Sequence, residues 1–526
     1  MTEKYGKNHP KVVAMKNAVT KWMVESLHPF TLVEEPGLLK VLEIADSRIS
    51  LPSAKTFSRT LVPELFEKTV AKMKCILESE KPTLQALSIT TDMWTSVNTT
   101  SYLAVTVHYV TKDFALTSYC LGCKAVMESH TGEVIRRELR NILTEWGLLG
   151  TKVLYCVTDN AANMRSAVTL MPDITQLFCF AHTLNLMIKD TKKEYSGFDK
   201  MRHKCKSIVE HFRHSAIARA NLHKRLKQLG MRELELVQNV ETRWNSEYLM
   251  MERLCELKDA LVIELSQPGC RIDNLTSMEW GLVDSYVKVL KPIYEATLQV
   301  SSDKKPTRSM IIPILFGIES RIKTVIENKQ QGSTLAKTLL KSLRSRFPMY
   351  MEDQLNLICM FLDPRFKFHI LEEPQKKIIL QKLETEIFAS IKEVPVGRLE
   401  ESAIKNITTS ATSQLFSIFE NSSCQRIQTN KRTLELQGKL QLEAYTNEPR
   451  ITINDDPFQW WQDNRFKYEL ISPLAQKYLG IPATEVASER VFSSAGNVIT
   501  NRRTRLLPEN AETLVFLHQN LKSLDV

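Results

Sequence analysis

Residues 87–122 read LSITTDMWTSVNTTSYLAVTVHYVTKDFALTSYCLG, and this stretch decides the fold class. Three short segments rich in β-branched and aromatic residues, at 87–92, 101–110 and 114–122, are separated by polar turns. That pattern predicts successive antiparallel strands. A helical pattern at about 132–146 and a further strand pattern at 152–159 follow. Together they predict a mixed α/β domain whose strand ends gather polar groups at one edge of the sheet.

Helical patterns flank this α/β segment on both sides. Apolar residues at 11–27 and at about 54–77 recur at helical spacing, which predicts a small helical lead-in. After residue 190 the pattern is almost wholly helical, which predicts an all-α insertion. Within it, the stretch at about 394–433 is rich in Ser, Thr, Asn and Gln and has the composition of a polar linker.

After the polar linker, the next recognisable helix start is at residues 455–457, where two aspartates precede a proline. An acidic cap followed by proline begins a helix, here one that carries Trp460 and Trp461 to about residue 478, and a last helical block covers 484–521. The chain thus divides into a helical lead-in (1–85), the first part of the α/β domain (86–190), the α-helical insertion (191–454) and a C-terminal part (455–526).

The composition is that of an ordinary globular protein. The chain has 526 residues, of which 43% are hydrophobic and 25% charged, and its length suggests several domains. No apolar run approaches the ~18 residues of a membrane helix, and the first residues lack the apolar core of a secretory signal. We therefore expect a soluble, intracellular protein that uses no membrane.

The ten cysteines are scattered along the chain rather than crowded into a disulfide framework, which predicts reduced thiols. Cys120 and Cys123 form one C-x-x-C, but no second pair stands at zinc-finger spacing and the segment has a strand pattern. We expect two buried thiols there rather than a zinc ion.

Basic residues give the chain a formal net charge of +10, which favours an anionic partner. They recur densely from Lys200 to Arg232, a stretch that includes Lys224, Arg225 and Lys227, and again at Arg502, Arg503 and Arg505. Both clusters are candidate phosphate contacts. The alternative for each is a solvated helix face, which is what charge-rich helices usually are.

Two aspartates stand where predicted strands run out, Asp92 in TTDMWTS and Asp159 in VTDNAANM. Two such carboxylates, joined by a third from a helix, can hold a pair of Mg²⁺ ions about 3.5–4 Å apart, the geometry used in phosphoryl transfer. Magnesium prefers hard oxygen ligands, so the residue type fits. An aspartate at a strand end is also a common turn former or helix cap.

Five motifs in order resolve these alternatives. TTDMWTS (90–96), VTDNAANM (157–164), the C-x-x-H of CFAHTLNL (179–186), ETRWNS (241–246) and SERVFS (488–493) stand in this sequence. Their combination closely resembles the hAT superfamily of DNA transposases and the zinc-finger BED-domain proteins descended from them. The resemblance implies a ribonuclease-H-like domain interrupted by a long α-helical insertion, with a C-terminal hAT dimerisation region.

By the same resemblance, Asp92 and Asp159 stand for the two catalytic aspartates of the family and Glu489 for the glutamate that returns after the insertion. Mg²⁺ or Mn²⁺ would be the cofactor. Glu485 lies one helical turn before Glu489, so helical periodicity leaves both open and only the motif selects Glu489.

The resemblance also places Trp244 where an aromatic residue stacks near a flipped DNA base, with Arg243 beside it as a phosphate contact. A tryptophan packed in the core of the insertion is the alternative. Cys179 and His182 match the C-x-x-H, and we expect them to line the site rather than to bind zinc with His211 and His214.

The C-terminal segment carries more large apolar residues than one helix needs, and a partner subunit or the rest of the chain could cover them. The surplus comprises Phe458, Trp460, Trp461, Tyr468, Leu474, Tyr478 and Leu479. The resemblance of this segment to the family's dimerisation region implies a homodimer or higher oligomer formed through it.

Many relatives begin with a BED zinc finger, but the 89 residues before the first motif contain one cysteine, Cys75. Two functions remain open: a nuclear transposase that cuts and joins double-stranded DNA, or a domesticated, non-catalytic nuclear factor that regulates transcription on the same scaffold. The intact set of three carboxylates favours chemistry, since a non-catalytic scaffold has no physical need to crowd mutually repelling groups.

Overall fold

The structure is a computed structural model that describes residues 3–150, 153–194, 198–240, 244–393, 431–500 and 506–524. At its centre lies a five-stranded sheet in the order β3-β2-β1-β4-β5. The strands are β1 (Leu87–Thr95), β2 (Ser101–Val110), β3 (Leu116–Val126), β4 (Val153–Thr158) and β5 (Thr175–Phe178). The first three pair antiparallel, while β4 pairs parallel with β1 and with β5. The predicted meander and fourth strand are confirmed, and β5 is an addition.

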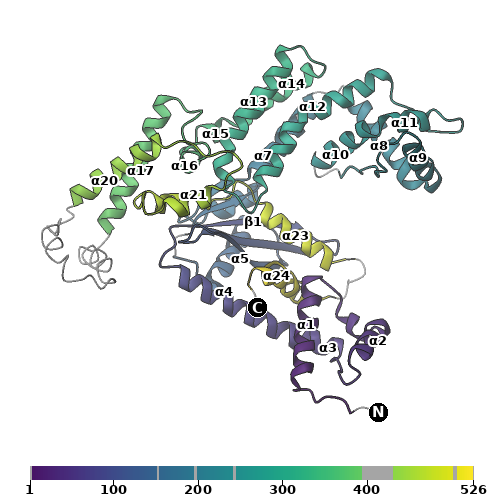
Figure 1. The fold of residues 1–526 in the computed structure, drawn as a ribbon, viewed down its shortest axis with the longest axis horizontal. Coiled ribbons are helices and arrows are strands. Elements are labelled where there is room, and N and C mark those ends of the chain that lie inside the picture. Colours follow the sequence, from purple (N-terminus) through teal and green to yellow (C-terminus); the bar gives the residue numbers. More distant parts are fainter. Residues whose placement is uncertain are drawn as a thin grey trace, which may run out of the picture.

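Both faces of this sheet are covered, and every residue of β2 is buried. On one face, Ile89, Val105 and Val107 share a core with α4 (Val62–Glu80), α5 (Gly132–Glu145) and α24 (Pro508–Leu524). Figure 1 shows these three helices on one side of the sheet, and α23 (Val486–Val498) with the helical insertion on the other. The sheet is thus a central layer covered on both faces.

The predicted helical lead-in is confirmed. Helix α1 (Pro10–Glu25) begins at a proline, and α2 (Pro36–Ala45) follows it. The helix expected at about 54–77 is present as α3 (Ala54–Thr56), a short π-helical turn (Phe57–Leu61) and α4.

The insertion begins earlier than predicted, because α7 (Phe180–Glu194) starts two residues after β5. The helices that follow are α8 (Asp199–His214), α9 (Ala216–Gln228), α10 (Trp244–Glu256), α11 (Lys258–Leu265), α12 (Ser277–Val300), α13 (Ile311–Glu327), α14 (Ser333–Arg346), α15 (Pro348–Met351), α16 (Gln354–Leu362), α17 (Glu373–Glu393) and α20 (Lys431–Asn447). Figure 1 shows α8–α11 and the α17–α20 pair at opposite ends of the insertion. The predicted polar linker lies outside the described residues except for 431–433, which begin α20.

The C-terminal part departs from prediction in one respect. The helix expected to run to about residue 478 is two helices, α21 (Pro457–Asn464) and α22 (Ser472–Leu479). Asp456 caps α21 as expected by accepting a hydrogen bond from the Phe458 amide at 2.9 Å. The second helix restarts on Pro473, which is tolerated in a first turn because its missing N–H would have no partner there.

The surplus of C-terminal apolar residues is covered within the chain itself. Trp461 is fully buried, its indole N–H donates to the Leu362 carbonyl at 2.8 Å, and its ring stacks on Phe114 of the β2–β3 turn. Phe458, Tyr468, Leu474, Tyr478 and Leu479 are buried with it, and Trp460 is partly buried. These side chains therefore join the sheet to the insertion, and of the two alternatives the rest of the chain, not a partner, covers them. Among the described residues no helix has both the length and the apolarity needed to cross a membrane.

Candidate acidic site beside strand β1

Helix α23 is held along β1 by two side-chain contacts. Side chains alternate between the faces of a strand, so Thr90, Asp92 and Trp94 point to the same face. The Thr90 hydroxyl lies 2.7 Å from the Ser488 hydroxyl, and the Trp94 ring stacks on Phe492 with centroids 5.9 Å apart. Because Ser488 and Phe492 are one helical turn apart, these contacts flank Asp92 and bring the neighbour of Ser488, Glu489, to the same face.

Asp92 lies within β1 rather than at its end, since it pairs with Ala104 and the strand continues to Thr95. Asp159 follows the last residue of β4, as predicted. Strand β4 runs parallel to β1 with Val157 opposite Thr90, so two residues further along each strand Asp159 and Asp92 are neighbours. The Asp159 Oδ1 accepts a hydrogen bond from the Ala161 amide at 3.0 Å, which fixes its orientation.

The three predicted carboxylates therefore meet from three distant segments of the chain. Burial raises the pKa of Asp92 to about 7, and the charges of Asp159 and Glu489 act in the same direction. A hydrogen bond from the Met93 amide at 2.7 Å opposes them. Asp92 is thus a half-buried acid whose ionised form is also repelled by its neighbours, an arrangement typical of functional sites.

A fourth carboxyl, that of Glu485, belongs to the same cluster. Its residue is 2% exposed, and burial raises its pKa to about 10, with repulsion from the other three acids adding to the effect. A hydrogen bond with the Cys179 thiol acts in the opposite direction. The family motif did not select Glu485. Its spacing of one helical turn from Glu489 is the feature of the sequence that points to it.

The C-x-x-H segment lines this cluster. The Cys179 amide donates to the Thr158 carbonyl at 2.8 Å, and the Cys179 Sγ accepts from the His182 amide at 3.4 Å. Burial lowers the pKa of His182, against the opposing charges of Asp159 and Glu489. His211 and His214 instead lie in the last turn of α8, a different helix from the one that begins beside Cys179 and carries His182.

The donor set fits a hard divalent cation, because its members are carboxylate oxygens and one of them, Glu485 Oε2, is buried without a hydrogen-bond partner. Among the described residues, no group of three or more His, Cys, Asp or Glu side chains is arranged so that it could hold a metal ion as it stands. Cys120 and Cys123 are buried in β3, as expected, and burial raises the pKa of the Cys120 thiol to about 12.

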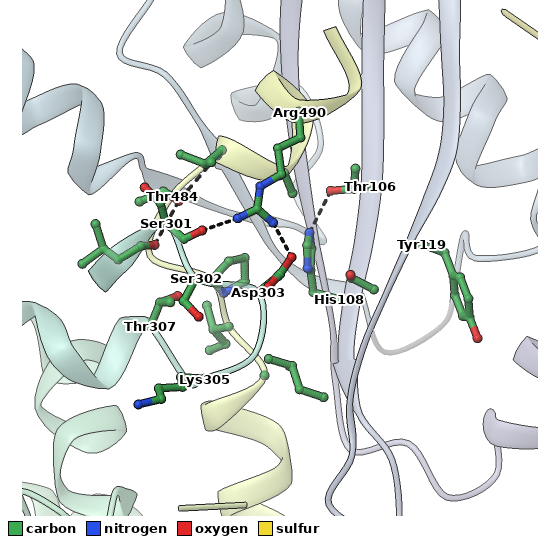
Figure 2. A pocket seen from close by; sticks show the side chains of 18 of the residues that line it. Thr106, His108, Tyr119, Ser301, Ser302, Asp303, Lys305, Thr307, Thr484 and Arg490 are labelled. Carbon is green, nitrogen blue, oxygen red and sulfur yellow. Dashed lines mark hydrogen bonds and ion pairs between the residues drawn. The ribbon is translucent and has the colours of Figure 1, made fainter. Parts of the chain in front are cut away.

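A polar cavity of about 270 Å³ lies beside α23, between β2 and the loop that follows α12 (Figure 2). Arg490, next to Glu489, lines it and donates to the Asp303 carboxylate and the Ser301 carbonyl, both at 2.6 Å. Burial lowers the pKa of His108 to about 4, so this side chain is neutral, and its Nε2 lies 2.7 Å from the Thr106 hydroxyl. The helix that carries Glu489 is therefore tied to the insertion.

Trp244 lies in the insertion, as the first residue of α10, and is 6% exposed. Its ring meets Tyr248 edge to face at 6.4 Å and lines a cavity of about 330 Å³. Five cationic side chains line the same cavity: Lys189, Lys192, Lys193, Arg202 and Lys206. Trp244 thus has features of both alternatives, a core residue of the insertion and a DNA contact. It is packed in the core, and it also lines a basic cavity. Arg243 lies outside the described residues.

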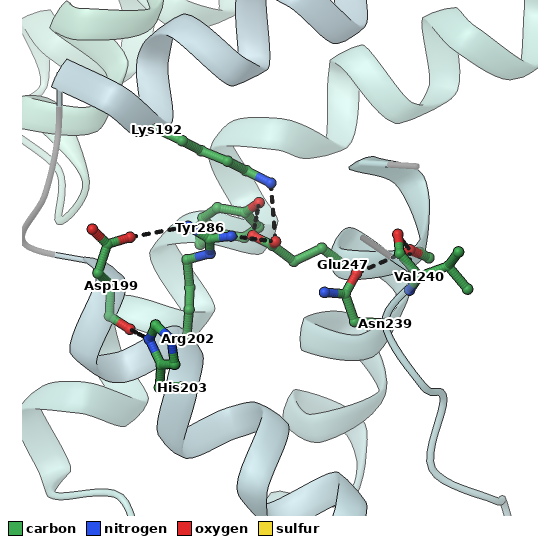
Figure 3. A network of polar contacts seen from close by, with 9 residues as sticks. Lys192, Asp199, Arg202, His203, Asn239, Val240, Glu247 and Tyr286 are labelled. Carbon is green, nitrogen blue, oxygen red and sulfur yellow. Dashed lines mark hydrogen bonds and ion pairs between the residues drawn. The ribbon is translucent and has the colours of Figure 1, made fainter. Parts of the chain in front are cut away.

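One buried acid organises this basic cavity (Figure 3). Glu247 is 3% exposed and accepts from Lys192 at 3.0 Å, Arg202 at 2.9 Å and the Tyr286 hydroxyl at 2.8 Å. Burial would raise the pKa of Glu247, but the two cations lower it. The cavity therefore keeps a positive excess while its cationic side chains are held in place.

The other predicted phosphate contacts differ from one another. Lys224 is exposed on α9, but Arg225 is committed to Glu264 at 2.8 Å, and Lys227 lies 3.5 Å from Glu233. Arg502 and Arg503 lie outside the described residues. The ion pair of Arg225 gives that residue a structural role which its position in the sequence did not reveal.

Comparisons with known proteins match each part of this architecture. Family models match at residues 90–183 (ZBED1 RNase-like domain), 177–289 (ZBED1 RNase-like helical domain) and 441–521 (hAT family C-terminal dimerisation region). Zinc finger BED domain-containing protein 4 of Homo sapiens is 25% identical over 534 residues, covering 99% of this chain and 44% of the relative.

Two further relatives bear different names. "Putative AC transposase" of Zea mays is 24% identical over 522 residues, covering 93% of this chain and 63% of the relative. "Putative transcriptional regulator tpeD" of Talaromyces stipitatus is 25% identical over 557 residues, covering 97% and 62%. The chain spans about half the length of the curated relatives it matches.

A mixed sheet interrupted after β5 by a helical insertion, and completed by α23 and α24, is a ribonuclease-H-like fold of the transposase type. The chain belongs to the hAT transposase family, in the branch that includes the BED-type proteins derived from such transposases.

Proposed function

We propose that this chain is a nuclear, dimerising transposase-like protein that binds double-stranded DNA and cleaves and rejoins it at a two-metal site. The observation that carries the proposal is the meeting of Asp92, Asp159 and Glu489, which come from β1, the end of β4 and α23. Burial, and to a smaller extent repulsion by Asp159 and Glu489, raises the pKa of Asp92, and a bound cation would offset both effects.

Each part of the site has a role in this proposal. Asp92, Asp159 and Glu489 would hold Mg²⁺ or Mn²⁺, which would supply Lewis-acid stabilisation of the charge that develops on the phosphate oxygens. Water is the first attacking group and a freed 3′-hydroxyl the second. His182 lines the same pocket and, with its lowered pKa, is neutral near pH 7.

DNA binding is assigned to the insertion. The basic cavity beside Trp244 offers cations for phosphate and an aromatic edge for a base, and Lys224 offers a further exposed charge. Arg243, Arg502 and Arg503 remain proposed contacts. Dimerisation is assigned to the hAT C-terminal region, where Phe466 is 81% exposed.

The test is cleavage of DNA that carries the sequence flanking the gene, with Mg²⁺ or Mn²⁺. The natural chain is compared with Asp92→Asn, Asp159→Asn and Glu489→Gln, and with the matched control Asp173→Asn, which changes an exposed loop aspartate. We expect cleavage by the natural chain and the control alone. Cleavage that persists in the three site variants would exclude this site as its source.

A second function is favoured by the name of the fungal relative, a transcriptional regulator. Under it, the same scaffold dimerises and binds DNA without cutting it. Binding and dimerisation by a chain that fails to cut with either metal would support this function over the first.

A further inference from the structure

Glu485 is the least explained ionisable group in the described part of the chain. It occupies the N-cap position of α23, yet its side chain makes no capping hydrogen bond. Its Oε2 is buried and has no hydrogen-bond partner, although the residue is only 2% exposed. A buried carboxyl oxygen without a partner costs free energy, and native structures rarely keep one without a reason.

The groups around Glu485 further raise the free-energy cost of ionising its side chain. The charges that act on it most strongly are the carboxylates of Asp92, Asp159 and Glu489, all of the same sign. The Cys179 thiol is its hydrogen-bonding neighbour, and that side chain is itself completely buried. Four carboxyl groups therefore lie close enough to repel one another, and the buried Oε2 of Glu485 has no hydrogen-bond partner.

Helical geometry adds a second constraint. Glu485 and Glu489 are one turn apart, and residues at this spacing lie on the same helix face. The Glu489 amide donates to the Glu485 carbonyl at 3.3 Å, so the first turn of α23 is formed between them. One helix thus presents two carboxyl groups to the two aspartates of the sheet.

We propose that Glu485 is a fourth oxygen ligand for the divalent cations that Asp92, Asp159 and Glu489 bind. The inference rests on the function proposed above. Four carboxylates balance the charge of two divalent cations, whereas three leave an excess of positive charge. Bound cations also give the buried Oε2 the partner that the protein does not provide.

The test is direct binding of Mn²⁺ to the full chain, followed by the electron paramagnetic resonance signal of the free ion. The natural chain, Glu485→Gln, Glu489→Gln and the matched control Glu133→Gln, an exposed glutamate in the first turn of α5, are titrated at one pH. We expect Glu485→Gln to lose about tenfold or more in Mn²⁺ affinity, or one bound ion per chain, and the control to lose nothing.

Melting temperatures measured without cations separate ligand binding from folding. Glutamine has the shape of glutamate and adds no charge, so Glu485→Gln should melt no lower than the natural chain. If that variant does not fold, Glu485→Ser replaces it with the same expected loss of Mn²⁺ affinity.

The outcomes distinguish this inference from the function on which it rests. Natural Mn²⁺ binding by Glu485→Gln or Glu485→Ser, together with weakened binding by Glu489→Gln, overturns the role of Glu485 and leaves the three-carboxylate site standing. Failure of the natural chain to bind Mn²⁺ overturns both.

Discussion

Replacing Asp92 with asparagine should stabilise the cation-free protein, and more so at higher pH. The pKa of Asp92 is raised from an ordinary value of 3.8 to about 7 in the folded chain. Between these values the folded state holds a proton that the unfolded state has lost, so the free energy of unfolding falls as the pH rises. Asparagine does not ionise and escapes this loss.

The magnitude follows from the two pKa values. With one pKa unit worth about 1.4 kcal/mol, ionisable Asp92 costs roughly 2 kcal/mol at pH 5.5 and about 4 kcal/mol at pH 8 relative to a neutral group. An unfolding entropy of about 2.1 cal/mol/K per residue gives about 1.1 kcal/mol/K for a cooperative chain of this length. Asp92→Asn should therefore melt higher by about 2 °C at pH 5.5 and about 4 °C at pH 8.

Differential scanning calorimetry in a chelating buffer measures this difference, with the exposed Asp173→Asn as control. Saturating Mn²⁺ should reverse the order, because the natural chain gains binding free energy that the variant cannot. A variant that melts lower than the natural chain at every pH, or an advantage that does not grow with pH, would refute the argument that Asp92 is a repelled, half-buried acid.

Three further predictions concern the rest of the molecule. Glu247→Gln should lower the free energy of unfolding in urea by about 3–5 kcal/mol, because two cations lose their buried partner; an unchanged midpoint would contradict the network. Lys224→Glu should weaken DNA binding and flatten its salt dependence without changing the melting temperature. Arg225→Glu should instead lower the melting temperature, because it breaks the ion pair with Glu264. If both variants had the same effects, Lys224 and Arg225 could not have these separate roles in DNA binding and in stability. Phe466→Ser should weaken self-association about tenfold by light scattering, and an unchanged dimer constant would move the interface elsewhere.

The central sheet was predictable because its signal is local. Strands β1 to β4 are rich in β-branched and aromatic residues and lie between polar turns. Strand β5 escaped prediction because it has four residues, and pairing with β4 rather than its own composition makes it a strand. The end of β1 could not be predicted from the sequence either. Composition placed the strand end at Asp92, but Asp92 pairs with Ala104 and the strand continues past it.

The acidic cluster was predictable only through the family motifs. Nothing in the local sequence says that Asp92 and Glu489, almost 400 residues apart, lie on one face of the sheet. Motif order supplied that information for three carboxyl groups and omitted Glu485, whose burial among them depends on how α23 sits along β1. Likewise, the partner of Arg225, Glu264, could not be inferred, because the ion pair joins α9 to α11 across tertiary structure.

The C-terminal aromatic residues show a different limit. Their number indicates that something large must cover them, but composition does not say whether that is a partner or the same chain. Trp461 is covered by the β2–β3 turn and by the carbonyl of Leu362, segments that are about 350 and 100 residues away. The proposed dimer would therefore use what remains exposed, and Phe466 is the large apolar side chain most exposed in the described residues.

The energetics of the acidic cluster bear on the choice between the two functions. Asp92 and Glu485 are destabilising as ionised groups in the cation-free chain, and neutral amides of the same shape would remove that cost. The helix that carries Glu489 is held on both sides, by Ser488 on Thr90 and by Arg490 on Asp303, which keeps the acids near one another. A scaffold that only binds DNA gains nothing from this crowding, whereas a cation site requires it. The arrangement of the site therefore favours chemistry over a purely regulatory role.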